Sequence, residues 1–126
     1  MVVANLYAAW IGVLLGLLSG IPLGLRFHDE NWLGGYSSWK RRLLRLGHVS
    51  FFGISFLNFA FVATVPYMHV PELSLLWPSR LFILALITMP TVCLLAAFNK
   101  PMRHLFVLPV LSVIGATGLF LYSFVS

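Results

Sequence analysis

Four long apolar stretches determine what this chain can fold into. They cover residues 3–25, 44–65, 81–98 and 105–125, each close to the roughly 20 residues that a helix needs to cross the hydrocarbon core of a bilayer. Hydrophobic residues make up 60% of the chain and charged residues 9%, against about 25% charged in a soluble domain. We therefore predict an all-α integral membrane protein, in which residues 1–126 form one domain. That domain is an antiparallel four-helix bundle of transmembrane helices with short loops.

The basic residues indicate how these helices are oriented. Seven of the eight lie in or beside the first and third connections, and only Arg80 lies beside the middle one; the seven are Arg26, Lys40, Arg41, Arg42, Arg45, Lys100 and Arg103. Basic connections face the cytoplasm, so we predict that both termini and loop 66–79 lie outside (N-out/C-out), in a bacterial-type inner (cytoplasmic) membrane. Because these charges flank apolar spans, the net charge of +5 indicates a lipid bilayer rather than nucleic acid as the partner.

Small residues recur at every fourth position of the first apolar stretch. They are Ala8, Gly12, Gly16, Gly20 and Gly24, and the last stretch has a shorter patch at Gly115, Ala116 and Gly118. Apolar helices in lipid associate through close backbone approach, which this glycine zipper permits. We predict tight helix packing here, either within the chain or against another subunit. A flat floor beside a planar cofactor requires the same spacing.

One ionisable residue lies inside the second stretch, and such residues mark functional sites in membrane proteins. It is His48, and its helical face also carries Arg41, Arg45, Phe52, Ser55 and Phe59. His104 begins the fourth stretch near the same membrane face, so the two imidazoles are candidate ligands of a haem b iron. Phe51, Phe52 and Phe106 would wall the haem, and Arg41 and Arg45 would pair with its propionates. Alternatively, His48 is hydrogen-bonded to a neighbouring helix and His104 is an interfacial residue.

The segment RLLRLGHVSFFGISFLN, residues 42–58, resembles the helix of haem–copper oxidase catalytic subunits that carries a low-spin haem histidine. The resemblance rests on a basic residue before the histidine, then Phe and Gly about a turn and a half later, and an Asn beyond. It covers one helix of four, and the other histidines of the copper and high-spin haem site have no counterpart here. The resemblance therefore implies a haem-binding helix and not an oxidase.

Other polar residues lie in the connections. His28, Asp29 and Glu30 are consecutive, and His69 and Glu72 flank Pro71. Consecutive loop residues splay apart, so we interpret the first group as a solvated loop, and we leave open whether His69 and Glu72 bind anything. The single cysteine, Cys93, excludes an internal disulfide.

Three functions fit these features. The first is a small integral subunit of a larger respiratory or electron-transfer complex, which binds haem b or lines a quinone pocket near His48. The second is a cofactor-free accessory subunit that packs onto larger membrane partners through its small-residue faces. The third is a small homo-oligomeric transporter or channel, which the location of all three acidic residues in loops disfavours. No span pairs carboxylates or a nucleophile with a base, so we expect a subunit rather than an enzyme by itself.

Overall fold

The computed structural model describes residues 2–126, and 86% of the structure is helical, with no strand in that range. Its four long helices are α1 (Val2–Arg26), α2 (Trp39–Thr64), α3 (Leu76–Phe98) and α4 (Val107–Tyr122). Short 3-10 helices lie between them: η1 (Trp32–Gly34), η2 (Val65–Tyr67), η3 (Glu72–Leu75) and η4 (Lys100–Phe106). The prediction of an all-helical chain with four helices long and apolar enough to cross a membrane is confirmed.

The helix bounds differ from the predicted spans where polar residues continue a helix. Helix α2 begins at Trp39 rather than residue 44, because the Ser38 side chain caps it by accepting a hydrogen bond of 3.2 Å from the Arg41 backbone N–H. The basic residues before His48 are therefore helical. Helix α3 begins at Leu76 rather than residue 81, and α4 covers a shorter range than predicted, because the tighter η4 turn precedes it.

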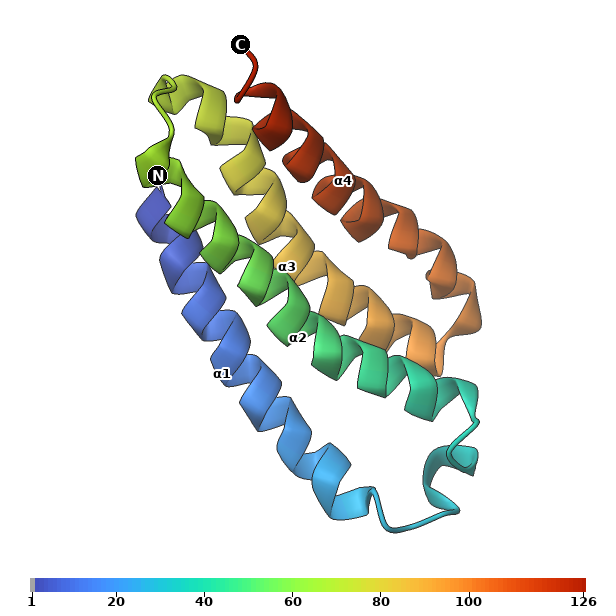
Figure 1. The fold of residues 1–126 in the computed structure, drawn as a ribbon. Coiled ribbons are helices and arrows are strands. Elements are labelled where there is room, and N and C mark those ends of the chain that lie inside the picture. The colour runs from blue at the N-terminus through green and yellow to red at the C-terminus, as the bar shows by residue number, and fades with distance from the viewer. Residues whose placement is uncertain (1) are drawn as a thin grey trace.

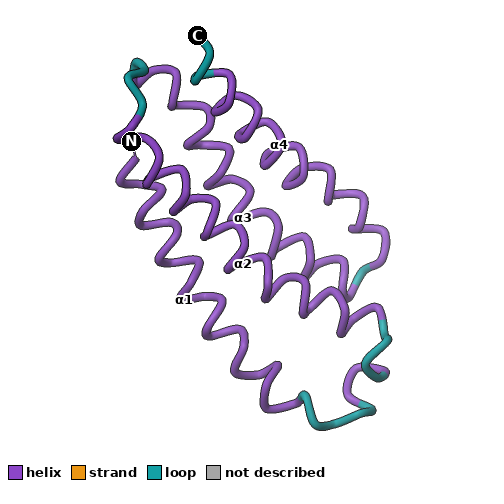
Figure 2. The backbone as a smooth tube through the Cα atoms, in the orientation of Figure 1, coloured by secondary structure: helices purple, strands orange, loops and turns teal. Residues whose placement is uncertain are grey.

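Consecutive helices run antiparallel, and both chain ends lie at the same end of the molecule (Figure 1). Helix α2 packs against α1 and α3, and α3 packs against α2 and α4, whereas α1 and α3 touch only lightly. The backbone trace in Figure 2 shows the same order, with loops gathered at the two ends. The four helices therefore form an open array with α1 and α4 at its edges, rather than the closed square of a compact bundle.

Three groups of buried apolar side chains hold α2, α3 and α4 together. The first is built around Phe61, Phe82 and Ala116, the second around Leu43 and Ala96, and the third around Ile54, Ala85 and Leu86. Most large apolar side chains of α1 and α4 point outward, as contact with a lipid bilayer requires.

A buried polar cluster joins α1, α2 and α3 near the end that carries the chain termini. Asn5 donates to Asn58 Oδ1 at 2.8 Å and to the Ser79 carbonyl at 3.1 Å, and the Ser79 hydroxyl donates back to Asn5 Oδ1. Asn58 also donates to the Ile54 and Phe82 carbonyls, at 2.9 and 3.3 Å. All three side chains are at most 2% exposed, so the cluster satisfies its own polar atoms where water is absent.

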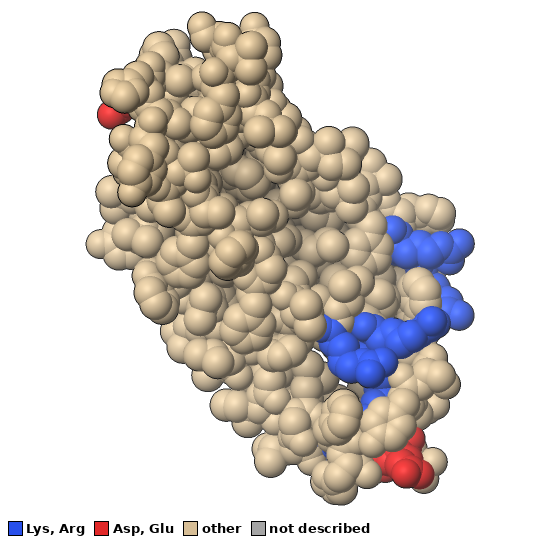
Figure 3. All heavy atoms as spheres, in the orientation of Figure 1, with Lys and Arg blue, Asp and Glu red and all other residues tan. Residues whose placement is uncertain are grey.

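The basic side chains gather at the opposite end, as Figure 3 shows in blue. This end holds the last turn of α1, the first turns of α2, and the connection from α3 to α4. The acidic side chains there lie beyond the basic ones, at the tip of the molecule (Figure 3). We call this region the basic end.

Candidate functional site

The glycine ladder of α1 packs directly onto the α2 face that carries His48. A Cβ added to Gly16 would lie 2.7 Å from the Phe52 ring, and one added to Gly20 would lie 3.0 Å from His48 Cε1. At Gly12 an added Cβ would collide with the Ser55 hydroxyl. The two patterns that the sequence offered separately are thus the two sides of one interface.

The imidazole of His48 lies half-buried in this interface, where Ser19 holds it. Its Nδ1 lies 2.9 Å from Ser19 Oγ, and Ser19 Oγ also lies 2.9 Å from the Gly16 carbonyl. Because the Ser19 hydroxyl donates its proton to the Gly16 carbonyl, it can only accept a hydrogen bond from His48 Nδ1–H. In this tautomer of His48 the lone pair is on Nε2. The Phe52 ring meets the imidazole edge to face at 5.3 Å. The arrangement resembles the hydrogen-bonded alternative that the sequence left open for His48.

Arg41 is folded over the connection from α1 to α2 rather than left free at the surface. The residue is 2% exposed, and its guanidinium donates to the Asp29, Trp32 and Phe27 carbonyls at 2.8, 3.4 and 3.3 Å. The rings of Tyr36 and Trp32 cover it at 4.1 and 5.4 Å. Arg41 therefore pins the loop with a buried positive charge.

Arg45 plays a lighter part in the same connection. Its side chain is exposed and donates to the Tyr36 carbonyl at 3.2 Å. The Tyr36 hydroxyl in turn donates to the Phe27 carbonyl at 2.6 Å. Both predicted propionate partners thus bond to loop carbonyls in this structure.

His104 lies away from His48. It is exposed in η4 and lines a hollow of about 440 Å³ between α3 and α4, whereas His48 faces α1. Helix α3 packs between α2 and α4 over most of their length (Figure 1). The structure does not bring the two imidazoles into one pocket, since His48 lines the cavity beside α1 and His104 lines the hollow between α3 and α4. Haem b ligation by the pair stays a prediction, because no measurement of bound haem tests it.

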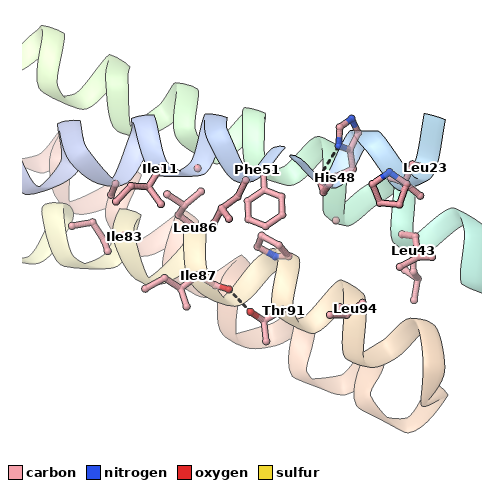
Figure 4. A pocket seen from close by; sticks show the side chains of 18 of the residues that line it. Ile11, Leu23, Leu43, His48, Phe51, Ile83, Leu86, Ile87, Thr91 and Leu94 are labelled. Carbon is pink, nitrogen blue, oxygen red and sulfur yellow. Dashed lines mark hydrogen bonds between the residues drawn. The ribbon is translucent and has the colours of Figure 1, made fainter. Parts of the chain in front are cut away.

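A groove of about 980 Å³ runs between α1 and α3 over α2 (Figure 4). Leu43, Leu44, Gly47 and Phe51 form its floor, and nearly all of its walls are apolar. His48 and Ser19 lie at its α1 edge, and Thr91, whose hydroxyl donates to the Ile87 carbonyl at 2.6 Å, lies on the α3 wall. We call this cavity the α1–α3 groove.

The remaining predicted packing residues are divided between contact and open surface. Ala8 packs beside the buried Ile54 group, and an added Cβ at Gly115 would lie 3.4 Å from Leu81 of α3. Gly24 and Gly118 have no atom within 4 Å of an added Cβ. The ladder thus packs within the chain from Gly12 to Gly20, and Gly118 faces outward.

The His, Asp and Glu residues of the connecting loops do not gather into a metal site. Within residues 2–126 no group of three or more His, Cys, Asp or Glu side chains is placed to hold a metal ion. Asp29 accepts a hydrogen bond of 3.0 Å from the backbone N–H of Asn31, as in a solvated turn.

Sequence reasoning missed two features. Asn5 and Ser79 complete the buried cluster with Asn58, and a polar residue at an apolar span end was the available sign. At Gly47 helix α2 approaches α3 closely, since an added Cβ would lie 3.1 Å from Cys93 Cβ.

Comparison with protein families, curated proteins and solved structures finds no match to this chain.

Proposed function

We propose that the chain is an integral membrane protein of the bacterial inner membrane, with its basic end in the cytoplasm and both termini outside. The segregation of seven basic residues to one end supports this orientation. Cysteine labelling tests it in a Cys93→Ala background, with Ser37→Cys at the basic end and Ser74→Cys at the other. A membrane-impermeant maleimide applied to intact spheroplasts is expected to label Ser74→Cys only. Labelling of Ser37→Cys alone would reverse the orientation.

We propose further that the protein is an accessory subunit of a larger electron-transfer complex, onto which it packs without carrying out the chemistry itself. The proposal is supported mainly by an exposed apolar stripe on the outer face of α4. This helix packs against α3, and its opposite face carries Leu111, Ile114, Gly118 and Leu121, spaced at three or four residues. The three apolar side chains are 58–61% exposed, and Gly118 has open space before it. A small residue within an apolar stripe permits close approach of another helix.

The polar residues of the interior support the same function. His48, Ser19, Asn5, Asn58 and Ser79 all bond to one another or to backbone within the chain. Their bonds fix the relative positions of α1, α2 and α3, as a rigid docking unit requires.

Blue-native electrophoresis of mildly solubilised native membranes tests this function. The wild-type chain is expected to migrate with a larger, redox-active assembly, and Gly118→Leu to migrate alone because the added side chain blocks close packing. Gly53→Leu is the matched control, since an added Cβ at Gly53 of α2 also meets no atom within 4 Å. Wild-type protein that migrates alone, or Gly118→Leu protein that keeps its assembly, would refute the proposal.

A separate measurement on the detergent-purified chain tests the cofactor predictions. A reduced-minus-oxidised spectrum of the isolated chain, with a pyridine haemochrome assay, measures haem b directly. A b-type band that His48→Ala and His104→Ala each abolish would make both imidazoles ligands, and would replace the accessory function with electron transfer.

A further inference from the structure

The dimensions of the α1–α3 groove limit what can fill it. Its lining on α1 extends from Ala4 to Leu23, about 28 Å of helix, which approaches the roughly 30 Å of a hydrocarbon core. A volume of about 980 Å³ over that length gives a mean section of about 35 Å². Extended hydrocarbon chains fit a groove of this section.

Cationic side chains continue the groove beyond its last apolar residues. On α1 the lining ends at Pro22 and Leu23, and Arg26 follows on the same helical face. On α2 Lys40 precedes Leu43 and Leu44 by three and four residues. Lys40 Nζ lies 5.7 Å from the ring of Phe98, one turn beyond Leu94 of the α3 wall. Two exposed cations therefore flank the mouth of the groove at the basic end.

A third positive charge lies behind this mouth. Trp32 lines the groove, and the buried guanidinium of Arg41 lies 5.4 Å from its ring. The acceptors of these side-chain hydrogen bonds of Arg41 are neutral backbone carbonyls, so none of the bonds neutralises its positive charge. Asp29 and Glu30 belong to the same connection, but the acidic side chains of this end lie farther from the apolar body than the basic ones (Figure 3). The cations thus lie between the apolar body and the acidic tip, which is where the membrane orientation proposed above would put lipid headgroups.

We propose that the α1–α3 groove binds an anionic phospholipid of the cytoplasmic leaflet. Its phosphate lies between Arg26 and Lys40, and its acyl chains lie along the half of the groove nearest the basic end. The charge of the mouth favours an anionic headgroup, and the apolar walls favour the chains. Basic pockets between transmembrane helices on the cytoplasmic side bind such headgroups.

Native mass spectrometry of the detergent-purified chain tests this proposal, with dioleoyl-phosphatidylglycerol and dioleoyl-phosphatidylcholine as probes that share acyl chains. Phosphatidylglycerol is expected to bind more tightly. Arg26→Gln combined with Lys40→Gln is expected to weaken it about 30-fold, or about 5-fold for each cation removed. The matched control combines Arg42→Gln with Arg103→Gln, two exposed cations of the same end that are not the proposed phosphate contacts, and it is expected to weaken binding less than the first double variant does.

A second pair of variants tests the groove itself. Leu94→Trp places a larger ring on the α3 wall, and Leu95→Trp places it on the adjacent exposed position outside the groove. Only Leu94→Trp is expected to weaken phosphatidylglycerol binding. Equal binding of the two lipids, equal losses in the two double variants, or unchanged binding by Leu94→Trp would overturn the proposal. Tighter binding of decylubiquinone, with loss of phosphatidylglycerol from the groove, would overturn it in favour of a quinone site.

Discussion

The contact of Gly12 with Ser55 makes a sharp prediction about how α1 is held. Both residues are buried, and a Cβ added to Gly12 would collide with Ser55 Oγ and lie 3.0 Å from a methyl group of Leu86. Overpacking of a close contact costs about 1–3 kcal/mol, so Gly12→Ala is expected to destabilise the fold by about that amount. The Ser55 hydroxyl has no hydrogen-bond partner in the structure. Its removal in Ser55→Ala is therefore expected to change stability by less than about 1 kcal/mol.

The double variant isolates the steric part of this cost. With the hydroxyl absent, the added methyl of Gly12→Ala meets mainly the flexible Leu86 side chain, so Ser55→Ala is expected to recover about 1–2 kcal/mol of the loss, as a coupling energy. Reversible unfolding in mixed detergent micelles, followed by circular dichroism, measures all four proteins.

Gly24→Ala is the matched control for the same ladder. No atom lies within 4 Å of its added Cβ, and its effect is expected to stay within about 0.5 kcal/mol. Equal effects of Gly12→Ala and Gly24→Ala, or a double variant that shows no coupling, would refute the packing of the ladder against α2.

Three further predictions concern polar contacts. Asn58→Leu removes the hydrogen bonds to Asn5, Ile54 and Phe82, and it is expected to lower the free energy of unfolding by about 1–2 kcal/mol in the same assay. An unchanged free energy of unfolding would show that these hydrogen bonds do not stabilise the fold. Arg41→Gln loses the carbonyl bonds that hold the first connection, so trypsin is expected to cut at Arg26 faster than in an Arg42→Gln control, and equal rates would contradict the pinning role. Trp39→Phe loses the 2.6 Å bond from Trp39 Nε1 to the Ala96 carbonyl and is expected to cost about 0.5–1.5 kcal/mol of unfolding free energy, with a smaller change for Trp77→Phe, whose ring is 60% exposed.

The sequence predicted the four helices because hydropathy and length alone specify a spanning helix. It did not predict how the helices are arranged, since lipid gives no hydrophobic reason for one apolar face to be chosen over another. The ladder illustrates this difference. Its spacing showed that one face of α1 packs closely, while the partner stayed open between another chain and this one. The partner became visible only when the structure placed His48, Phe52 and Ser55 opposite the glycines.

The predicted haem site shows a second limit of sequence reasoning. Residue type placed Arg41, Arg45 and His48 among candidate cofactor ligands, because guanidinium and imidazole groups serve that chemistry. The same groups also satisfy backbone carbonyls and hydroxyls that lipid leaves without water. In the structure Arg41 bonds to loop carbonyls and His48 to Ser19, and no property of the sequence separates these two uses.

The register of α1 against α2 links the packing interface to the proposed lipid site. Going along α1 from Gly12 to Gly16 and Gly20, the opposing α2 residue moves back from Ser55 to Phe52 and His48, as antiparallel helices in steady contact require. The contact then stops, because Gly24 has open space where the next opposing side chain would lie. The helices have separated by that point, and the connection that carries Trp32, whose carbonyl accepts a hydrogen bond from Arg41, links their ends. A bulkier residue at Gly20 is therefore expected to widen this separation and weaken both helix packing and phosphatidylglycerol binding, whereas Gly24→Ala is expected to leave both unchanged. Loss of packing without loss of lipid binding in a Gly20→Leu variant would show that the groove does not depend on the ladder.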